Sequence, residues 1–213
     1  TRAFRWHTGD IERVQWHNSD RPLAYDLSPY EETLLIDVDY LTFNNQLKGY
    51  FGGNHEFLCY DRVWDVTHTD SMKNDATMTS AGHPMLWATV VYFRKCELAH
   101  RIFEMMKNIQ TTWYYQSKFW GFSSRNYRND FSLTLAHQLM QGYQQGTTFN
   151  HPLPSLSTMD TIYKVKDSEL LIKYMYNGSD NAVRIKDTNL HVMNKACLMD
   201  PEIRGELERY ANV

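Results

Sequence analysis

A short apolar segment followed by two aspartates is the feature that most constrains the fold of this chain. Residues 33–36 are apolar or β-branched, and Asp37 and Asp39 follow directly, separated by one residue. A segment of this kind predicts a strand. Side chains alternate between the two faces of a strand, so Asp37 and Asp39 are expected to emerge on the same side where the strand ends. The fold must therefore accommodate two negative charges side by side at that position.

Two carboxylates on one face repel each other unless a positive group lies between them. A divalent cation is the simplest such group, because magnesium and manganese take oxygen ligands, usually one or two carboxylates together with phosphate oxygens of a substrate. The alternative is structural, since an Asp after a strand often forms a turn or caps a helix. On the first interpretation, Asp37 and Asp39 bind Mn²⁺ or Mg²⁺.

The rest of the chain alternates predicted strands with predicted helices. Apolar or alternating stretches indicate further strands at residues 55–66, 85–93 and 182–185. Apolar side chains at helical spacing indicate helices at residues 97–109, 129–141 and 201–211, and a proline near its start indicates a short helix at 20–27. Residues 67–84 are polar and predict a loop. The expected class is α/β, with a mixed sheet flanked by helices.

Composition sets the outer limits. A length of 213 residues with 42% hydrophobic side chains suits a single domain over residues 1–213. A net charge of -3 argues against a global basic field for nucleic acid, but leaves local basic patches open. Three widely spaced cysteines favour a reducing compartment. Without a signal peptide or an apolar run of ~20 residues, the chain is expected to be cytoplasmic, with no membrane partner.

The order of motifs resembles that of GT-A-fold nucleotide-sugar glycosyltransferases, notably the glycogenin-like retaining branch. In residues 21–41 a basic residue opens a helix, a proline precedes an aromatic and an acidic residue, and the strand ends in D-x-D. Residues 84–93, 128–131 and 190–195 then resemble, in order, the donor-sugar strand, the acidic start of a helix and a late His-containing stretch. The resemblance implies a GT-A-like (Rossmann-like) fold.

The chain departs from that pattern in three places. Relatives have Asn-Ala-Gly where this chain has Trp87-Ala88-Thr89, and its late motif is His-x-x-Asn-Lys instead of His followed by Gly and a more distant Lys. Relatives also place an opening strand and a nucleobase-binding loop well upstream of D-x-D, whereas 36 residues precede Asp37 here. The first strand and the nucleobase-binding segment are therefore expected to lie outside this chain.

The resemblance implies transfer of a sugar from a nucleoside-diphosphate sugar to a hydroxyl acceptor. It implies that Asp37, Asp39 and His191 bind Mn²⁺ or Mg²⁺, which would act as a Lewis acid on the leaving diphosphate. A neutral imidazole suits manganese better than magnesium. Lys195 and Arg21 are the candidates for binding the phosphates. For His191 the alternative is an ordinary surface or core histidine, and for Lys195 a solvated charge.

The same resemblance assigns the reacting sugar to a second set of residues. Asp130 is the candidate catalytic group, oriented by Arg128, and Trp87 and Thr89 are candidates for the donor pocket. Asp130 also suits a structural role, because carboxylates stabilise helix N-termini, and core packing accounts equally well for Trp87. Two further acidic residues, Asp61 and Asp65, are candidates for acceptor contacts, and the alternative is a solvated loop.

An aromatic and basic patch lies between residues 113 and 128. Its members are Trp113, Tyr114, Tyr115, Lys118, Phe119, Trp120, Arg125, Tyr127 and Arg128. Such interleaving suits stacking on bases or sugars, whereas the alternative is a partly buried flap over the core. On the first interpretation the acceptor is a hydroxymethylated DNA base flipped out of the duplex, as in virus-encoded (phage) enzymes that glycosylate DNA. A nucleic-acid-binding module and a noncatalytic GT-A relic remain the other function classes.

Overall fold

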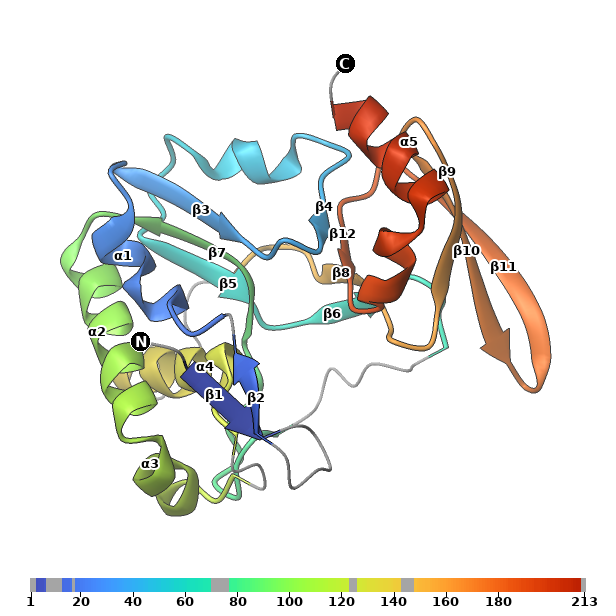
Figure 1. Cartoon of the computed structure of the whole chain (residues 1–213). Coiled ribbons are helices and arrows are strands. Elements are labelled where there is room, and N and C mark those ends of the chain that lie inside the picture. The colour runs from blue at the N-terminus through green and yellow to red at the C-terminus, as the bar shows by residue number, and fades with distance from the viewer. Residues whose placement is uncertain are drawn as a thin grey trace. The chain divides into compact units, whose positions relative to one another are not determined.

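The computed structural model describes residues 3–6, 13–16, 18–69, 77–122, 126–142 and 148–211 and shows a mixed α/β protein (Figure 1). The chain divides into two compact units, each assembled from three separate stretches. Unit 1 comprises residues 1–35, 54–61 and 74–150, and unit 2 comprises residues 36–53, 62–73 and 151–213. The α/β class expected from the sequence is confirmed, although the described strands form several small sheets instead of one mixed sheet.

Unit 1 contains a three-stranded sheet with β7 in its centre. The strand order is β3 (Glu32–Ile36), β7 (Trp87–Arg94), β5 (Phe57–Tyr60), with β5 antiparallel to β7. The other elements are the hairpin β1 (Ala3–Trp6) and β2 (Arg13–Trp16), η1 (Arg21–Leu23), α1 (Ala24–Leu27), α2 (Glu97–Thr111), α3 (Trp113–Phe119) and α4 (Asn129–Met140). Central β7 is buried along its length except at Arg94, as a continuous apolar strand should be.

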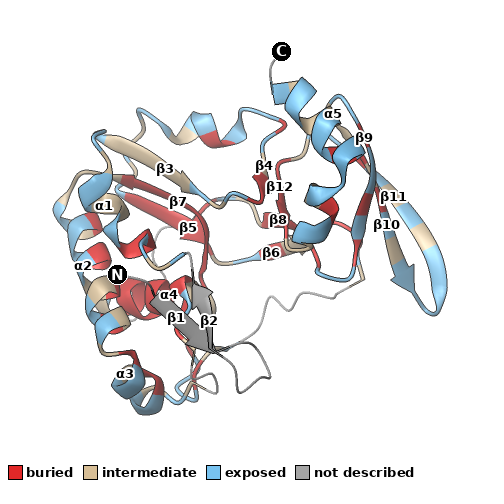
Figure 2. Cartoon of the chain, in the orientation of Figure 1, coloured by how far each residue is buried: buried red, intermediate tan, exposed pale blue. Residues whose placement is uncertain are grey.

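The helices of unit 1 bury different amounts of their surface. Helix α2 is amphipathic and buries one face, which includes Ile102, Phe103 and Met106. Helix α4 is buried at every residue from 131 to 138, which requires contacts on all of its sides (Figure 2). Both helices share one core with β5 and β7. The N-terminus of α4 is thereby held against the beginning of β7.

Unit 2 contains two sheets. The first has the order β4 (Tyr40–Leu41), β12 (Leu190–Val192), β8 (Leu153–Leu156), β6 (Val63–Asp65), antiparallel between β4 and β12 and parallel elsewhere. The second is antiparallel, with the order β11 (Ser179–Lys186), β10 (Glu169–Tyr176), β9 (Thr161–Lys166). The helical elements are η2 (Gln46–Tyr50), η3 (Lys195–Met199) and α5 (Pro201–Ala211).

Tight turns fix the register of the second sheet. Asn177 and Gly178 have φ angles of 51° and 76° and connect Tyr176 to its partner Ser179. Two central residues with positive φ are the mark of a type I′ hairpin turn, which favours Asn-Gly. The sheet packs its apolar face against α5 in the core of unit 2.

Most predicted elements are confirmed within a few residues. The helices at 97–109, 129–141 and 201–211 are α2, α4 and α5, and the strands at 33–36 and 85–93 are β3 and β7. The stretch 55–66 is two strands, β5 and β6, and the strand at 182–185 is part of β11. Residues 70–76 of the predicted loop lie outside the described residues, whereas β8, β9, β10 and β12 were not predicted.

Within the described part, no helix has the length and apolar character needed to span a membrane.

Candidate functional site

The three predicted metal ligands come together in unit 2. Asp37, Asp39 and His191 each offer a ligand atom, and these atoms lie within 4.8 Å of one another. The chain leaves β3 through a turn in which the Tyr40 amide donates to the Asp37 carbonyl at 3.1 Å. Strand β4 then pairs with β12 so that Tyr40 lies opposite His191. β3 ends at Ile36, before both aspartates, so the structural alternative of a turn at D-x-D is present, and this turn brings the carboxylates to the imidazole.

Asp39 is the most buried carboxylate of this group, with 4% of its surface exposed. Its Oδ2 lies 2.8 Å from Lys195 Nζ, and its Oδ1 lies 3.8 Å from His191 Nε2. Lys195 opens η3 shortly after β12, and its side chain is 69% exposed. The backbone of Asp39 is fixed as well, because its carbonyl accepts a 2.9 Å hydrogen bond from the Val192 amide.

The two oxygens of Asp39 differ in their bonding. Oδ1 is buried and accepts no hydrogen bond from any described residue. A buried carboxylate oxygen left in this condition loses its hydration without compensation. Two carboxylates and an imidazole form a donor set that suits Mn²⁺ and, with less preference, Mg²⁺. The residues present therefore fit a divalent cation bound between Asp37, Asp39 and His191.

The residues assigned to the sugar belong to unit 1 and form a group of their own. Asp130 lies in the first turn of α4, with a side chain that is 15% exposed. Its Oδ1 accepts a 2.9 Å hydrogen bond from the Ala88 amide, and its Oδ2 accepts one of 2.8 Å from Arg128 Nη2. Each of its oxygens thus has a donor, and the carboxylate fastens the start of α4 to β7.

Arg21 is held on the backbone of the same strand. It is 8% exposed and donates to the Ala88 carbonyl and, at 3.1 Å, to the Thr89 carbonyl. Trp87 and Thr89 are buried, with 9% and 2% of their surface exposed. Arg21 therefore has a structural role in unit 1, whereas Lys195 belongs to unit 2. The phosphate role of Arg21 and the donor-pocket roles of Trp87 and Thr89 stay predictions.

Unit 2 also contains a buried pair of acids, only one of which was singled out from the sequence. Asp65 Oδ1 accepts from the Thr67 amide at 3.1 Å and from the Thr67 hydroxyl at 2.8 Å. The same hydroxyl lies 3.1 Å from Asp160 Oδ2, to which Ser157 donates at 3.0 Å. Burial, with a contribution from Asp65, raises the pKa of Asp160. Asp65 is thus part of a buried polar network and not of a solvated loop, and Asp61 lies in the turn after β5.

The aromatic patch divides into a core part and an exposed part. Trp113 and Tyr127 are buried, and the Trp113 ring stacks on Phe131 at 5.7 Å. The exposed aromatic residues of α3 are Tyr114, Tyr115 and Phe119, with 63%, 72% and 78% of their surface exposed. Lys118 lies over the Tyr114 ring, and Arg125 lies outside the described residues. The flap interpretation describes Trp113 and Tyr127, whereas the exposed aromatic rings of α3 face solvent.

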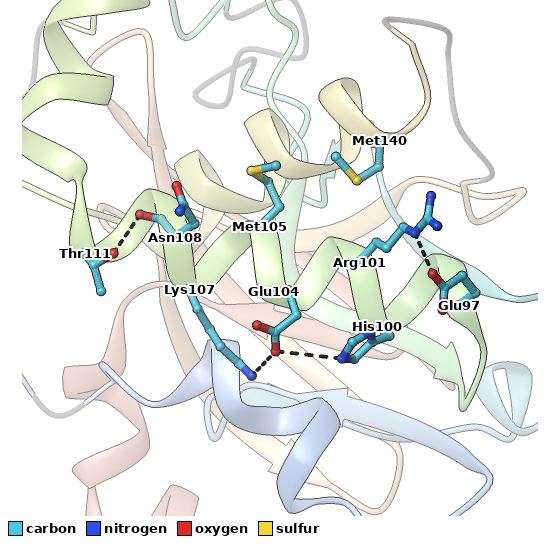
Figure 3. A pocket seen from close by; sticks show the side chains of 9 residues that line it. All are labelled: Glu97, His100, Arg101, Glu104, Met105, Lys107, Asn108, Thr111 and Met140. Carbon is cyan, nitrogen blue, oxygen red and sulfur yellow. Dashed lines mark hydrogen bonds and ion pairs between the residues drawn. The ribbon is translucent and has the colours of Figure 1, made fainter.

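A groove of about 630 Å³ follows helix α2 in unit 1 (Figure 3). Its charges largely neutralise one another, since Arg101 pairs with Glu97 at 2.7 Å and Glu104 lies between Lys107 and His100. None of the residues that line it is a predicted site residue. The size of this groove therefore does not mark it as the functional site.

Comparisons of the chain with models of protein families, with curated proteins and with solved structures found no match.

Proposed function

We propose that this protein is a metal-dependent glycosyltransferase that moves a sugar from a nucleoside-diphosphate sugar to a hydroxyl acceptor. The observation that carries the proposal is the Oδ1 atom of Asp39, which is buried, accepts no hydrogen bond from the described residues and lies 3.8 Å from His191 Nε2. Together with Asp37, this arrangement offers a cation three ligands, two from the turn between β3 and β4 and one from β12.

The residues of unit 2 have separable roles under this proposal. Asp37, Asp39 and His191 would hold Mn²⁺ or Mg²⁺, which when bound stabilises the negative charge of a leaving diphosphate. Lys195 orients Asp39 through one of its three N–H donors. Its exposed ammonium group leaves the other donors available to a phosphate oxygen.

The residues of unit 1 would act on the donor sugar. Asp130 carries a negative charge that favours the positive charge developing at the anomeric carbon, and Arg128 holds its Oδ2 in place. Trp87 and Thr89 would line the donor pocket. The finer fold assignment, GT-A-like with the first strand and nucleobase-binding segment outside this chain, and a cytoplasmic location are parts of the same proposal, supported by the order of the motifs along the chain.

The test measures whether the chain binds a divalent ion together with a nucleoside diphosphate. Free Mn²⁺ has a paramagnetic resonance signal that disappears on binding, so a titration with and without uridine, guanosine, adenosine and cytidine diphosphates gives both affinities. The His191→Ala variant should bind Mn²⁺ at least tenfold more weakly, an effect larger than its effect on folding stability. The matched control is His100→Ala on the exposed face of α2. Equal manganese affinity of wild type and His191→Ala would refute the ligand assignment.

A second candidate concerns the acceptor and rests on α3. Three aromatic side chains of this short helix are exposed, and Lys118 accompanies them. Aromatic side chains with a nearby cation are suited to stacking on nucleic-acid bases. This observation favours a hydroxymethylated DNA base as acceptor, or a nucleic-acid-binding module without catalysis. Salt-sensitive DNA binding that survives Asp39→Ala without any turnover would support the module, and failure to bind every nucleoside diphosphate would leave the noncatalytic relic.

A further inference from the structure

The three-stranded sheet of unit 2 has two unlike faces. One face is apolar and lies in the core with Ile203 of α5. The residues that it buries are Ile162 and Val165 on β9, Leu170 and Ile172 on β10, and Ile185 on β11. The opposite face is exposed to solvent (Figure 2). The inner face explains the stability of the sheet, whereas the composition of the outer face needs a separate explanation.

The outer face concentrates positive charge. Its exposed cations are Lys164 and Lys166 on β9, Lys173 on β10, and Arg184 and Lys186 on β11. The strand register places them in rows, with Glu169 between Lys166 and Lys186, and Leu171 between Lys164 and Arg184. Glu169 is engaged by Arg184 at 3.3 Å, and Asp180 near the hairpin turn is the other carboxylate of this face. The face is therefore positive in a chain whose net charge is -3.

The cations border a shallow hollow. A depression of about 240 Å³ is lined by Lys164, Lys166, Glu169, Leu171 and Arg184. The outer strands β9 and β11 are separated by two strand spacings, or about 10 Å, with the half-buried Leu171 between them. Two columns of cations thus flank a strip wide enough for an extended polyanion.

An aromatic side chain extends this surface. The register between β9 and β10 shifts between Leu171 and Ile172, and Tyr163 faces solvent beside this bulge, with 56% of its surface exposed. Lys173 Nζ lies 3.4 Å from the centroid of the Tyr163 ring. A ring with a cation beside it can stack on a nucleobase while the cation contacts a phosphate.

Two simpler explanations of the positive outer face, protection of the sheet edges and attraction to a membrane, account for fewer of its features. Charges on edge strands prevent unwanted pairing with other sheets, but either sign would serve, and here both edges carry the same sign. An anionic membrane would also attract the cations, but such surfaces bury a continuous apolar face in the lipid. The hollow contains one half-buried leucine instead.

We propose that the outer face of β9, β10 and β11 binds the phosphate backbone of a nucleic acid strand, with Tyr163 stacking on a base. The proposal does not depend on glycosyl transfer, because it uses no residue of the candidate metal site. It assigns a sequence-independent affinity to the surface, since every contact named is to phosphate or to the face of a base.

The test is the anisotropy of a fluorescein-labelled 20-nucleotide DNA, single-stranded and as a duplex, titrated with the full chain between 50 and 200 mM NaCl. The four-site variant carries Lys164→Gln, Lys166→Gln, Arg184→Gln and Lys186→Gln. We expect it to bind at least ~tenfold more weakly at 50 mM NaCl. The slope of log affinity against log salt should fall by about 0.7 per lost contact for the single strand and about 0.9 for the duplex.

The matched control removes the same charge from other exposed positions. Its substitutions are Lys48→Gln, Arg101→Gln, Arg204→Gln and Arg209→Gln. A separate variant, Tyr163→Leu, should lose about tenfold affinity for the single strand while keeping the salt slope. The double variant Lys164→Gln and Lys166→Gln replaces the four-site variant if that one does not fold.

Two outcomes would overturn the proposal. The first is a control that loses as much affinity and salt dependence as the four-site variant, because the effect would then come from net charge alone. The second is wild-type binding to vesicles of phosphatidylserine and phosphatidylcholine that depends on these four residues, with no binding to DNA or to a matched RNA. Neither outcome alters the manganese titration, so the two proposals fail independently.

Discussion

Asp39 in unit 2 and Asp130 in unit 1 are similar by every simple criterion and different in their bonding. Each is largely buried, and each pairs at 2.8 Å with a basic side chain that is more exposed than itself. The difference lies in the second oxygen. Oδ1 of Asp130 accepts a hydrogen bond from the Ala88 amide, whereas Oδ1 of Asp39 accepts no hydrogen bond from the described residues.

Asp130 is therefore a carboxylate with a hydrogen bond at both oxygens, whereas Asp39 has one oxygen without a hydrogen bond from the described residues. Asp130 contributes to stability by satisfying a backbone amide, whatever it does in addition. Asp39 loses hydration at Oδ1 and gains no hydrogen bond there from the described residues, so a cation that enters would compensate the loss. Burial and a salt bridge alone do not identify a functional acid, whereas the state of each oxygen distinguishes the two.

The largest effect is expected for Asp39→Asn. The substitution keeps the size of the side chain and removes its charge, so we predict that metal-dependent transfer, or hydrolysis of the nucleotide sugar, falls by hundreds of times or more. That corresponds to the ~3–4 kcal/mol lost when a key charge-stabilising group is removed. Asp37→Asn should act in the same direction. The measurement is release of nucleoside diphosphate with Mn²⁺ present.

The control for this experiment is Asp167→Asn, at an exposed turn of the same unit where Asn tolerates the positive φ of 52°. It should leave turnover unchanged. An Asp39→Asn variant with near wild-type turnover would show that the incomplete oxygen has no part in the chemistry, and the comparison with Asp130 would lose its functional meaning.

The next effect concerns His137, which is 1% exposed in the core of unit 1. Burial lowers its pKa to about 4 from an ordinary 6.5. Because the unfolded chain binds a proton in this range and the folded chain does not, the His137 contribution to stability is complete above pH 6.5 and is lost as the pH falls toward 4. The loss amounts to about 3 kcal/mol.

Urea denaturation between pH 7 and pH 4 measures this effect. Carboxylates titrate in the same range, so the informative quantity is the difference between wild type and His137→Gln at each pH. His100→Gln, with an exposed ring on α2, is the control and should follow the wild type. A constant difference between wild type and His137→Gln would contradict the lowered pKa.

Asp130 should give a smaller effect that separates its two roles. Asp130→Ala leaves the Ala88 amide without its acceptor, which should cost about 1–3 kcal/mol of unfolding free energy in urea. Asp130→Asn keeps an oxygen for this amide and removes the charge, so it should recover most of that stability. If Asp130→Asn is stable and inactive, the charge is catalytic; if it is stable and fully active, Asp130 is structural only.

The sequence predicted best the elements whose signal is local. The apolar spacing of α2 and the continuous apolar stretch of β7 lie within single segments, and both elements were predicted within a few residues. Strand β8 contains Pro154, and β12 has three residues, so neither has a pattern of its own, and both exist because they pair with distant strands. The Asn177-Gly178 turn was a usable signal for the β10–β11 hairpin that was not applied.

In the candidate site, too, patterns within a segment predicted only local features, and the features that depend on distant pairing needed another source or were missed. The spacing of Asp37 and Asp39 is local, and the two carboxylates do lie near each other, although both belong to the turn after β3 and not to a strand. His191 and Lys195 came from a resemblance in motif order, and the pairing of β4 with β12 brings them to Asp39. No pattern within a segment could have shown that the Ala88 amide satisfies Asp130, 42 residues further along the chain. The missed Asp160 also depends on a distant partner, Thr67.

The smallest effect is expected at Asp160, and its sign is opposite to that of His137. The Thr67 hydroxyl has one proton but lies 2.8 Å from Asp65 Oδ1 and 3.1 Å from Asp160 Oδ2. If it donates to Asp65, a proton on Asp160 allows Asp160 to donate to the Thr67 oxygen. Burial, with a contribution from Asp65, raises the pKa of Asp160, so the uptake of a proton by the folded chain stabilises the fold at low pH, and this contribution is lost as the pH rises through that pKa.

Urea denaturation of wild type and of Asp160→Asn at each pH measures the contribution of the Asp160 proton to stability. Wild type should gain stability relative to the variant as the pH falls from 7 to 4, because Asn cannot take up the proton. Asp200→Asn is not a suitable control, because Asp200 Oδ1 accepts hydrogen bonds from two amides at the start of α5. The exposed position Asp167 is the better control. A difference that is constant or that moves in the other direction would show that Asp160 is ionised throughout. The Thr67 hydroxyl would then donate to one carboxylate at a time, and each acid would keep a second donor, the Thr67 amide for Asp65 Oδ1 and the Ser157 hydroxyl for Asp160 Oδ2.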